Sequence, residues 1–189
     1  RYLVSQGARV TYILRQTEPD QPKRKKLGPR CIVLRISDAT PCGGKPSELG
    51  GSVMEMIDKG LRMLQEEPDT PNIVHSQYWI GGALGKAISG ALSIRHVHFF
   101  LSLGRLTNSN TIQLSPQQKV RDALEIEVYQ QADCLIAQSV FLAEQFKFLY
   151  PEITHDRISV IHHGVDHDVF TQRPESTGDY LRRSSSRFS

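Results

Sequence analysis

The most constraining feature of this sequence is the run over residues 94–101, which alternates at first and then becomes wholly apolar through Phe99, Phe100 and Leu101. An alternating strand presents one face to water, whereas a continuous apolar run fits a central strand buried on both faces. All-parallel sheets, whose strands are joined by crossover helices, occur almost only where both faces are covered. The run therefore fits the central strand of a parallel sheet in an α/β protein.

Further short apolar runs alternate with amphipathic segments along the chain. Strands are expected at residues 10–14, 31–36, 72–75, 134–137 and 158–161, and helices at 53–67, 81–92, from 115 onward and 139–149. This order indicates a doubly wound parallel sheet. Ser115 is expected to cap its helix together with Gln118, because the two form a capping-box pattern. The polar stretch over residues 15–29 is expected to be a loop.

Length and composition favour one globular domain, because 189 residues with 39% hydrophobic and 23% charged side chains can bury a single substantial core. We expect this domain to cover residues 1–174 and to be followed by a disordered tail, rich in serine and arginine, over residues 175–189. No apolar run approaches the length of a membrane span, and the first residues do not resemble a signal peptide. A cytoplasmic location is therefore expected.

The net charge of +3 and the number of cysteines, three, exclude few classes of protein by themselves. The positions of the basic residues and of the cysteines in the chain are more informative. The basic residues gather at 23–26 and 182–187, without interleaved aromatic residues that could stack on bases, so nucleic acid is not an expected partner. The cysteines are far apart and lack a C-x-x-C pair, which argues against a disulfide framework or a zinc site. No metal ligands are assigned.

Two polar segments follow predicted strands and are the candidate binding site. The first contains Gln77 and Tyr78, and the second contains Ser102 and Arg105. Open parallel sheets bind ligands at the carboxyl ends of their strands, so these segments are expected to form the floor of a cleft. Two plainer interpretations stay open at this point: Tyr78 and its neighbour could be aromatic core, and Arg121 could simply pair with Glu125 one helical turn away. Lys45, in a glycine-rich loop, is either an anion contact or an ordinary surface lysine.

Three motifs, in this order and spacing, resemble a known enzyme family. They are VHSQYW followed by Gly81 and Gly82, SLGR followed by the R-x-x-x-E of Arg121 and Glu125, and ADCLIAQS followed by RISVIHHGVDHDVF. Together they resemble the amino-terminal lobe of retaining, GT-B-fold glycosyltransferases of the family-4 type, in particular the sucrose-phosphate synthase and sucrose synthase group. The resemblance covers residues 1–174 and implies a Rossmann-like sheet whose first strand would precede residue 1.

In that family the first lobe holds the acceptor sugar, the second lobe holds most of the nucleotide-sugar donor, and no metal ion is required. The resemblance implies a hinge at Gly164 and Asp166. It also implies an acceptor-binding set, in which hydroxyl groups orient sugar oxygens and a guanidinium binds phosphate. This set comprises Lys45, Gln77, Tyr78, Ser102, Arg105 and Arg121.

The sequence departs from the family pattern at positions that matter for chemistry. Leu101 stands where the family has a histidine against the reacting sugar, Thr107 stands where it tends to have a lysine, and Gln77 and Ile80 replace a histidine and an aspartate. His98 is an unlikely substitute for the missing histidine, because strand alternation places it on the opposite face from Leu101. The catalytic residue is therefore left unassigned.

The resemblance implies an intact enzyme that transfers glucose from UDP- or ADP-glucose to a sugar phosphate, as in sucrose biosynthesis, without a tightly bound cofactor. The 189-residue chain is expected to be a lobe truncated at both ends, without the carboxy-terminal donor lobe, and therefore inactive alone. It is also expected to self-associate through an exposed sheet edge. A degenerate, non-catalytic domain that binds a sugar phosphate or a partner is the main alternative. A nucleotide- or nucleic-acid-binding Rossmann-like domain is a third alternative.

Overall fold

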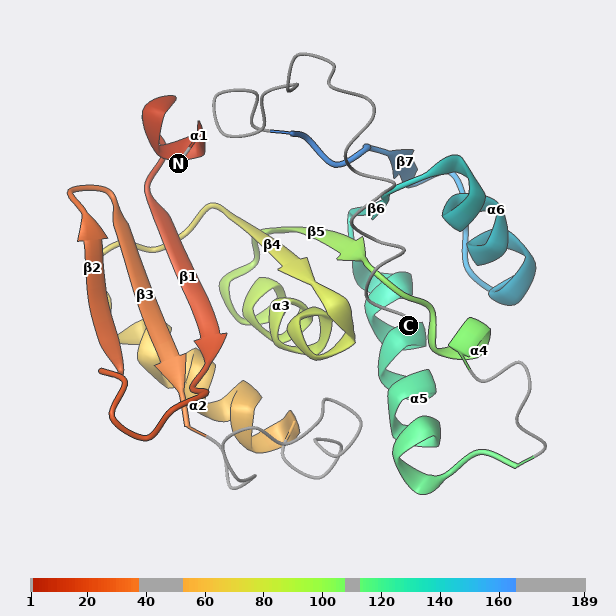
Figure 1. Ribbon diagram of the computed structural model, residues 1–189, viewed down its shortest axis with the longest axis horizontal. Helices are drawn as coiled ribbons and strands as arrows, with labels where there is room; N and C mark the ends of the chain where they lie inside the picture. Colours follow the sequence, from red (N-terminus) through yellow and green to blue (C-terminus); the bar gives the residue numbers. More distant parts are fainter. Residues whose placement is uncertain (1, 38–52, 108–112, 166–189) are drawn as a thin grey trace, which may run out of the picture.

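The computed structural model describes residues 2–37, 53–107 and 113–165, and its strands form two sheets (Figure 1). The first has the order β1-β3-β2 and the second the order β4-β5-β6-β7, with every pair parallel except β2 and β3. The strands are β1 (Val10–Arg15), β2 (Arg24–Gly28), β3 (Cys31–Ile36), β4 (Ile73–Gln77), β5 (Arg95–Phe100), β6 (Cys134–Ala137) and β7 (Ile158–Val160). The predicted parallel sheet is confirmed, with the apolar β5 between two partners.

Two of the helices begin where the capping signals in the sequence predict. Ser115 accepts a hydrogen bond from Gln118 N and the Gln118 side chain accepts one from Ser115 N, which confirms the capping box. Ser139 likewise accepts a hydrogen bond from Leu142 N. The helices are α1 (Tyr2–Ser5), α2 (Val53–Gln65), α3 (Tyr78–Leu92), α4 (Gly104–Thr107), α5 (Pro116–Gln131) and α6 (Val140–Leu149). Only α3 begins earlier than expected, directly at the end of β4.

The loop expected over residues 15–29 is wrong in its second half, because residues 24–28 form β2 and pair antiparallel with β3. The segment carries no apolar period, so its sequence did not suggest a strand. What selects the strand is the free edge of β3, whose backbone groups need hydrogen-bond partners. Lysine and arginine are well suited to such an edge because their charges discourage further pairing.

The four long helices all cover the same face of the sheet layer. His96 and His98 of β5 lie against glycines of α3, and Phe100 of the same face packs on Phe146 of α6 with ring centroids 4.9 Å apart. Tyr129 of α5 completes this aromatic core, with its ring centroid 4.9 Å from that of Phe146. In Figure 1, α3 lies between α2 and α5. Tyr12 alternates with the core residue Ile13, so it belongs to the other face, and its side chain is exposed.

The two sheets share one layer of helices although β1 and β4 are not hydrogen-bonded to each other. Ile13 of β1, Ile36 of β3 and Val74 of β4 pack in a single apolar cluster with α2 and α3. Both β1 and β4 are therefore edge strands.

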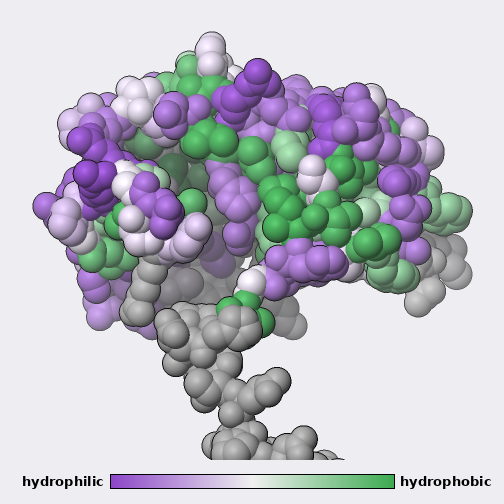
Figure 2. Space-filling model, turned by 90° about the horizontal axis from the view of Figure 1, so that it is seen from above, coloured by the Kyte–Doolittle hydropathy of each residue, from purple (hydrophilic) through white to green (hydrophobic). Residues whose placement is uncertain are grey.

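Figure 2, a view from above, shows apolar side chains gathered over one area of the surface. Self-association through a sheet edge stays a prediction.

Some expectations fall outside the described residues, namely those for Lys45, for Asp166 and for the tail over 175–189. Within the described ranges, no helix is long and apolar enough to cross a membrane.

Candidate functional site

The turn from β4 into α3 is the first feature of the site. Gln77 ends β4 and Tyr78 begins α3 with a φ of 62°, so no connecting residue separates strand from helix. A left-handed backbone at a non-glycine residue costs about 1–2 kcal/mol. Strain of this kind persists only where the surroundings impose it, and it often marks a functional position. Here it places the Tyr78 ring at the carboxyl end of the sheet.

Arg121 of α5 joins this turn to the segment that follows β5. Its Nε donates to Glu125 Oε1 at 2.7 Å and its Nη2 donates to Ser102 Oγ at 3.0 Å. The guanidinium carbon lies 5.4 Å from the centre of the Tyr78 ring. The structure therefore brings together Tyr78, Ser102 and Arg121, three of the residues that the sequence proposed. The pairing of Arg121 with Glu125 is also present, so the plainer interpretation of that pair holds alongside the grouping.

Glu125, one turn along α5, holds the Arg121 side chain through its carboxylate. Its side chain is 1% exposed and its Oε2 accepts from Gly104 N at 2.9 Å and from the Tyr150 hydroxyl at 2.6 Å. Burial is the main reason that the pKa of the Tyr150 hydroxyl lies well above its usual value, and the nearby Glu125 carboxylate raises it further. The phenol therefore keeps its proton and can donate it in a hydrogen bond. A Cβ at position 104 would lie 2.6 Å from Glu125 Oε2, so glycine is required there. The buried carboxylate is compensated by three donors and orients the guanidinium.

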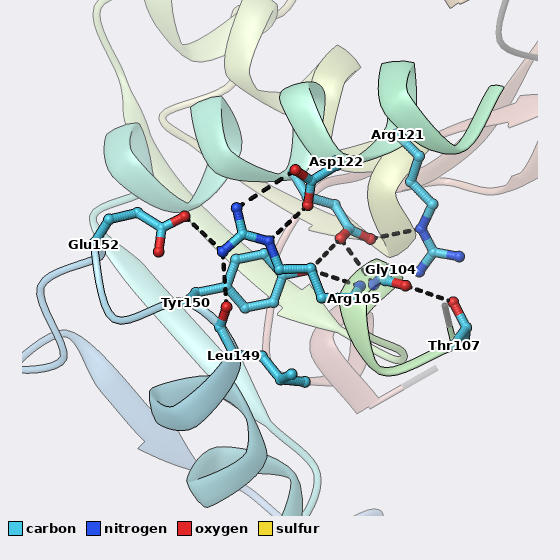
Figure 3. Close-up of polar contacts among 9 residues, drawn as sticks. Gly104, Arg105, Thr107, Arg121, Asp122, Leu149, Tyr150 and Glu152 are labelled. Carbon is cyan, nitrogen blue, oxygen red and sulfur yellow. Dashed lines mark hydrogen bonds and ion pairs between the residues drawn. The ribbon is translucent and has the colours of Figure 1, made fainter. Parts of the chain in front are cut away.

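Arg105 lies close by in the chain but points elsewhere (Figure 3). Its guanidinium is 2.8 Å from Asp122, 2.7 Å from Glu152 and 2.7 Å from the Leu149 carbonyl oxygen, and it stacks 4.5 Å above the Tyr150 ring. These contacts tie α4 to α5 and to the end of α6. The structure does not bring Arg105 together with Tyr78, Ser102 and Arg121.

The remaining candidate positions lie around this group. Gln77 ends β4 with its side chain exposed, and Gly164 is exposed beyond β7. Thr107 donates its hydroxyl to the Gly104 carbonyl oxygen at 2.8 Å, and Leu101 is half-buried. No local sequence pattern pointed to Tyr150, which is 25 residues from Glu125 and meets it only through the packing of α6.

A second polar cluster lies under α3. The Ser76 hydroxyl is 2.7 Å from His96 Nε2 and 2.8 Å from His98 Nδ1. Burial lowers the pKa of His96 to about 4 and that of His98 to about 3, so both imidazoles are neutral near pH 7. His98 faces α3, where it lies against Gly82. Among the described residues, no group of three or more His, Cys, Asp or Glu is arranged to hold a metal ion.

The fold of this chain is shared by solved structures. Sucrose-phosphate synthase from Thermosynechococcus elongatus superposes with a TM-score of 0.71 at 21% identity, over 89% of this chain and 41% of that one. The chain therefore has the fold of an amino-terminal lobe of a GT-B glycosyltransferase. The model of glycosyltransferase family 4 matches residues 1–169, and the chain belongs to this family.

Relatives of known activity agree with that assignment. D-inositol 3-phosphate glycosyltransferase from Thermobispora bispora is 25% identical over 178 residues, and mannosylfructose-phosphate synthase from Agrobacterium fabrum is 31% identical over 151 residues. The alignments cover 93% and 72% of this chain. The chain spans 41% of the length of the first relative and 32% of the second.

Proposed function

We propose that this chain is the acceptor-side lobe of a hexosyltransferase and that it binds the phosphate of a sugar phosphate through Arg121. The observation that carries the proposal is the placement of the Arg121 guanidinium between the Glu125 carboxylate and the Ser102 hydroxyl, at the ends of β4 and β5. Ligands of open parallel sheets bind at this edge.

The chemistry of the group suits a phosphorylated sugar. Nε and one N–H of Nη2 are engaged by Glu125 and Ser102, and a guanidinium has five N–H donors, so further donors remain for phosphate oxygens. The Ser102 hydroxyl can hydrogen-bond to the ligand as well, and the Tyr78 ring offers an apolar surface with a polar end. Both relatives described above, and the sucrose-phosphate synthase, carry a phosphorylated compound in their names.

For the protein that carries both lobes, we propose transfer of glucose from a nucleotide-glucose, UDP- or ADP-glucose, to this acceptor with retention of configuration. The donor is a substrate in this proposal and not a tightly bound cofactor. The 189-residue chain contributes acceptor binding, so mixing it with nucleotide-glucose and fructose phosphate is expected to give no product.

A second candidate is a domain that binds a sugar phosphate or a partner without catalysis. Leu101 and Thr107 favour it, since Leu101 supplies no polar group and the Thr107 hydroxyl is engaged by the Gly104 carbonyl oxygen. In a protein with both lobes, L101H should raise the transfer rate if this position limits an otherwise intact enzyme. An unchanged rate would favour the non-catalytic candidate.

The proposal is tested by calorimetric titration of the 189-residue chain with fructose 6-phosphate and with fructose. Saturable binding is expected for the phosphorylated sugar, and R121Q should weaken it at least tenfold because a charge-assisted pair is lost. R105Q is the matched control: its guanidinium is engaged by Asp122 and Glu152, so this variant should lose stability while it keeps the affinity. If wild type and R121Q bound fructose 6-phosphate with equal affinity, the proposal would be wrong.

A further inference from the structure

We propose that His163, held by Gln138, is a further binding residue, which contacts the sugar part of the ligand whose phosphate is bound by Arg121. This inference rests on the proposed function and adds a second end to the same site. It concerns a residue that none of the sequence motifs singled out as a ligand contact.

The chain beyond β7 is held in place by β6. Ile161 N donates to the Ala137 carbonyl oxygen at 2.9 Å, so pairing continues past the end of β7. His162 Nδ1 then lies 3.0 Å from the Gln138 carbonyl oxygen, and His163 Nε2 lies 2.6 Å from Gln138 Oε1. The single half-buried Gln138 thereby fixes two successive histidines at the carboxyl end of β6.

The imidazole of His163 reaches across to β5. Its ring lies edge-on to Phe99, with centroids 5.5 Å apart and an interplanar angle of 80°. Phe99 is 8% exposed and gives the imidazole a rigid support from the sheet. His163 thus lies above the end of β5, although its own chain segment comes from β7.

This position is at the same edge of the sheet as the Arg121 group. Phe99 is the register partner of Gln77, and the next residue along from Gln77 is Tyr78. Ser102, which contacts Arg121, is three residues beyond Phe99, and the chain bends there, so these two residues are at most about 10 Å apart. A hexose phosphate has a comparable length, so one molecule lying across the strand ends can contact Arg121 and His163 together.

The hydrogen bond to Gln138 also decides what His163 can offer. With Gln138 Oε1 as the acceptor, Nε2 of His163 donates this hydrogen bond, and in the tautomer protonated at Nε2 the Nδ1 atom can accept. An imidazole that accepts through Nδ1 suits a sugar hydroxyl, which is a donor. The site therefore combines a guanidinium for phosphate with an imidazole acceptor for a hydroxyl group.

The test compares two probes, fructose 6-phosphate and inorganic phosphate, by calorimetry on the 189-residue chain. We expect H163A to weaken binding of fructose 6-phosphate about tenfold and to change the affinity for inorganic phosphate less than twofold. H163N should restore part of the lost affinity, because its amide oxygen can replace Nδ1 as an acceptor. H162A is the matched control and should bind both probes like wild type.

The outcomes separate this inference from the proposed function. Unchanged fructose 6-phosphate binding in H163A, together with its loss in R121Q, would overturn the role of His163 and leave the proposed function standing. Equal weakening of both probes by H163A, or the same loss in H162A, would show a structural role and overturn the inference. If R121Q binds like wild type, or wild type does not bind fructose 6-phosphate, both proposals fall. Thermal unfolding of each variant checks that it is folded.

Discussion

Two buried polar clusters lie on the same face of the sheet, and they are compensated in opposite ways. In the carboxylate cluster, Glu125 is charged and accepts from Arg121, Gly104 and Tyr150. In the histidine cluster, Ser76 is shared by His96 and His98, which burial keeps neutral. A buried charge needs several donors, whereas neutral imidazoles need few.

The difference follows from where each cluster lies. The carboxylate cluster is at the strand ends, beside the partly exposed Arg121, and it joins the segment after β5 to α5 and the end of α6. The histidine cluster is under α3, where Nδ1 of His96 is buried and makes no hydrogen bond to the described residues. The first cluster can therefore orient a binding group, and the second mainly fixes how α3 packs on the sheet.

The largest effect should come from removing the charge of the first cluster. E125A leaves the Arg121 guanidinium, the Tyr150 hydroxyl and the Gly104 N–H without their acceptor, and breaking a buried ion pair costs about 3–5 kcal/mol. Urea unfolding at pH 7 measures the loss. E144A is the control, since Glu144 forms an exposed pair with Lys147 at 2.9 Å and should cost less than about 1 kcal/mol. Similar losses in both variants would contradict the contrast between buried and exposed carboxylates.

The histidine cluster should make the fold sensitive to acid. The folded pKa values of about 4 and about 3 lie below the ordinary value of 6.5, so the unfolded chain binds more protons. Stability is then fully present above pH 6.5 and falls as the pH drops toward 4, by about 1.4 kcal/mol per pH unit for each histidine. Urea unfolding from pH 7 to pH 4.5 measures this slope. H98Q should reduce it by about half, and an unchanged slope would show that other groups cause the acid sensitivity.

A smaller effect is expected from Y150F. The variant keeps the ring that packs on Phe146 but removes the donor to Glu125 Oε2, and a lost hydrogen bond to a buried charged group costs about 2 kcal/mol. The free energy of unfolding should therefore fall by less than in E125A. A double variant, Y150F with E125A, should be worse than E125A alone only by the loss of the acceptor for Arg105 N at 3.2 Å, because both changes remove the bond between Tyr150 and Glu125. Additive losses would mean that the hydroxyl acts through another contact.

The smallest changes in stability are expected from variants that probe how tightly α3 packs on the sheet. A Cβ at Gly85 would lie 2.7 Å from His96 Nε2 and 2.8 Å from Ser76 Cβ, so G85A should destabilise by about 1–3 kcal/mol through overpacking. G90A is the control on the same helix: nothing lies within 4 Å of its Cβ, and alanine should stabilise by up to about 1 kcal/mol. The thermal unfolding midpoints of the two variants measure this difference. If G85A were as stable as G90A, α3 could shift to accommodate the added methyl group without a loss of stability.

The strands, the helix caps and part of the site could be predicted from the sequence for a common reason. The apolar run of β5, the box of Ser115 and Gln118, and the i, i+4 pair of Arg121 and Glu125 depend on neighbours within a few residues. The strand β2 was missed because a polar segment next to a free sheet edge has no pattern of its own. The orientation of Arg105 was missed because its partners come from α5 and from the end of α6.

The parallel α/β architecture, the family and the residue types of the candidate site can be read from the amino-acid sequence. That Arg121 meets Ser102 and Tyr78, that Arg105 does not, and that His163 lies above Phe99 depends on the folded structure. The physical reason is the range of the interactions. Hydrophobic period and capping act along the chain, whereas hydrogen bonds and ring contacts between distant segments exist only once the strands have aligned their ends.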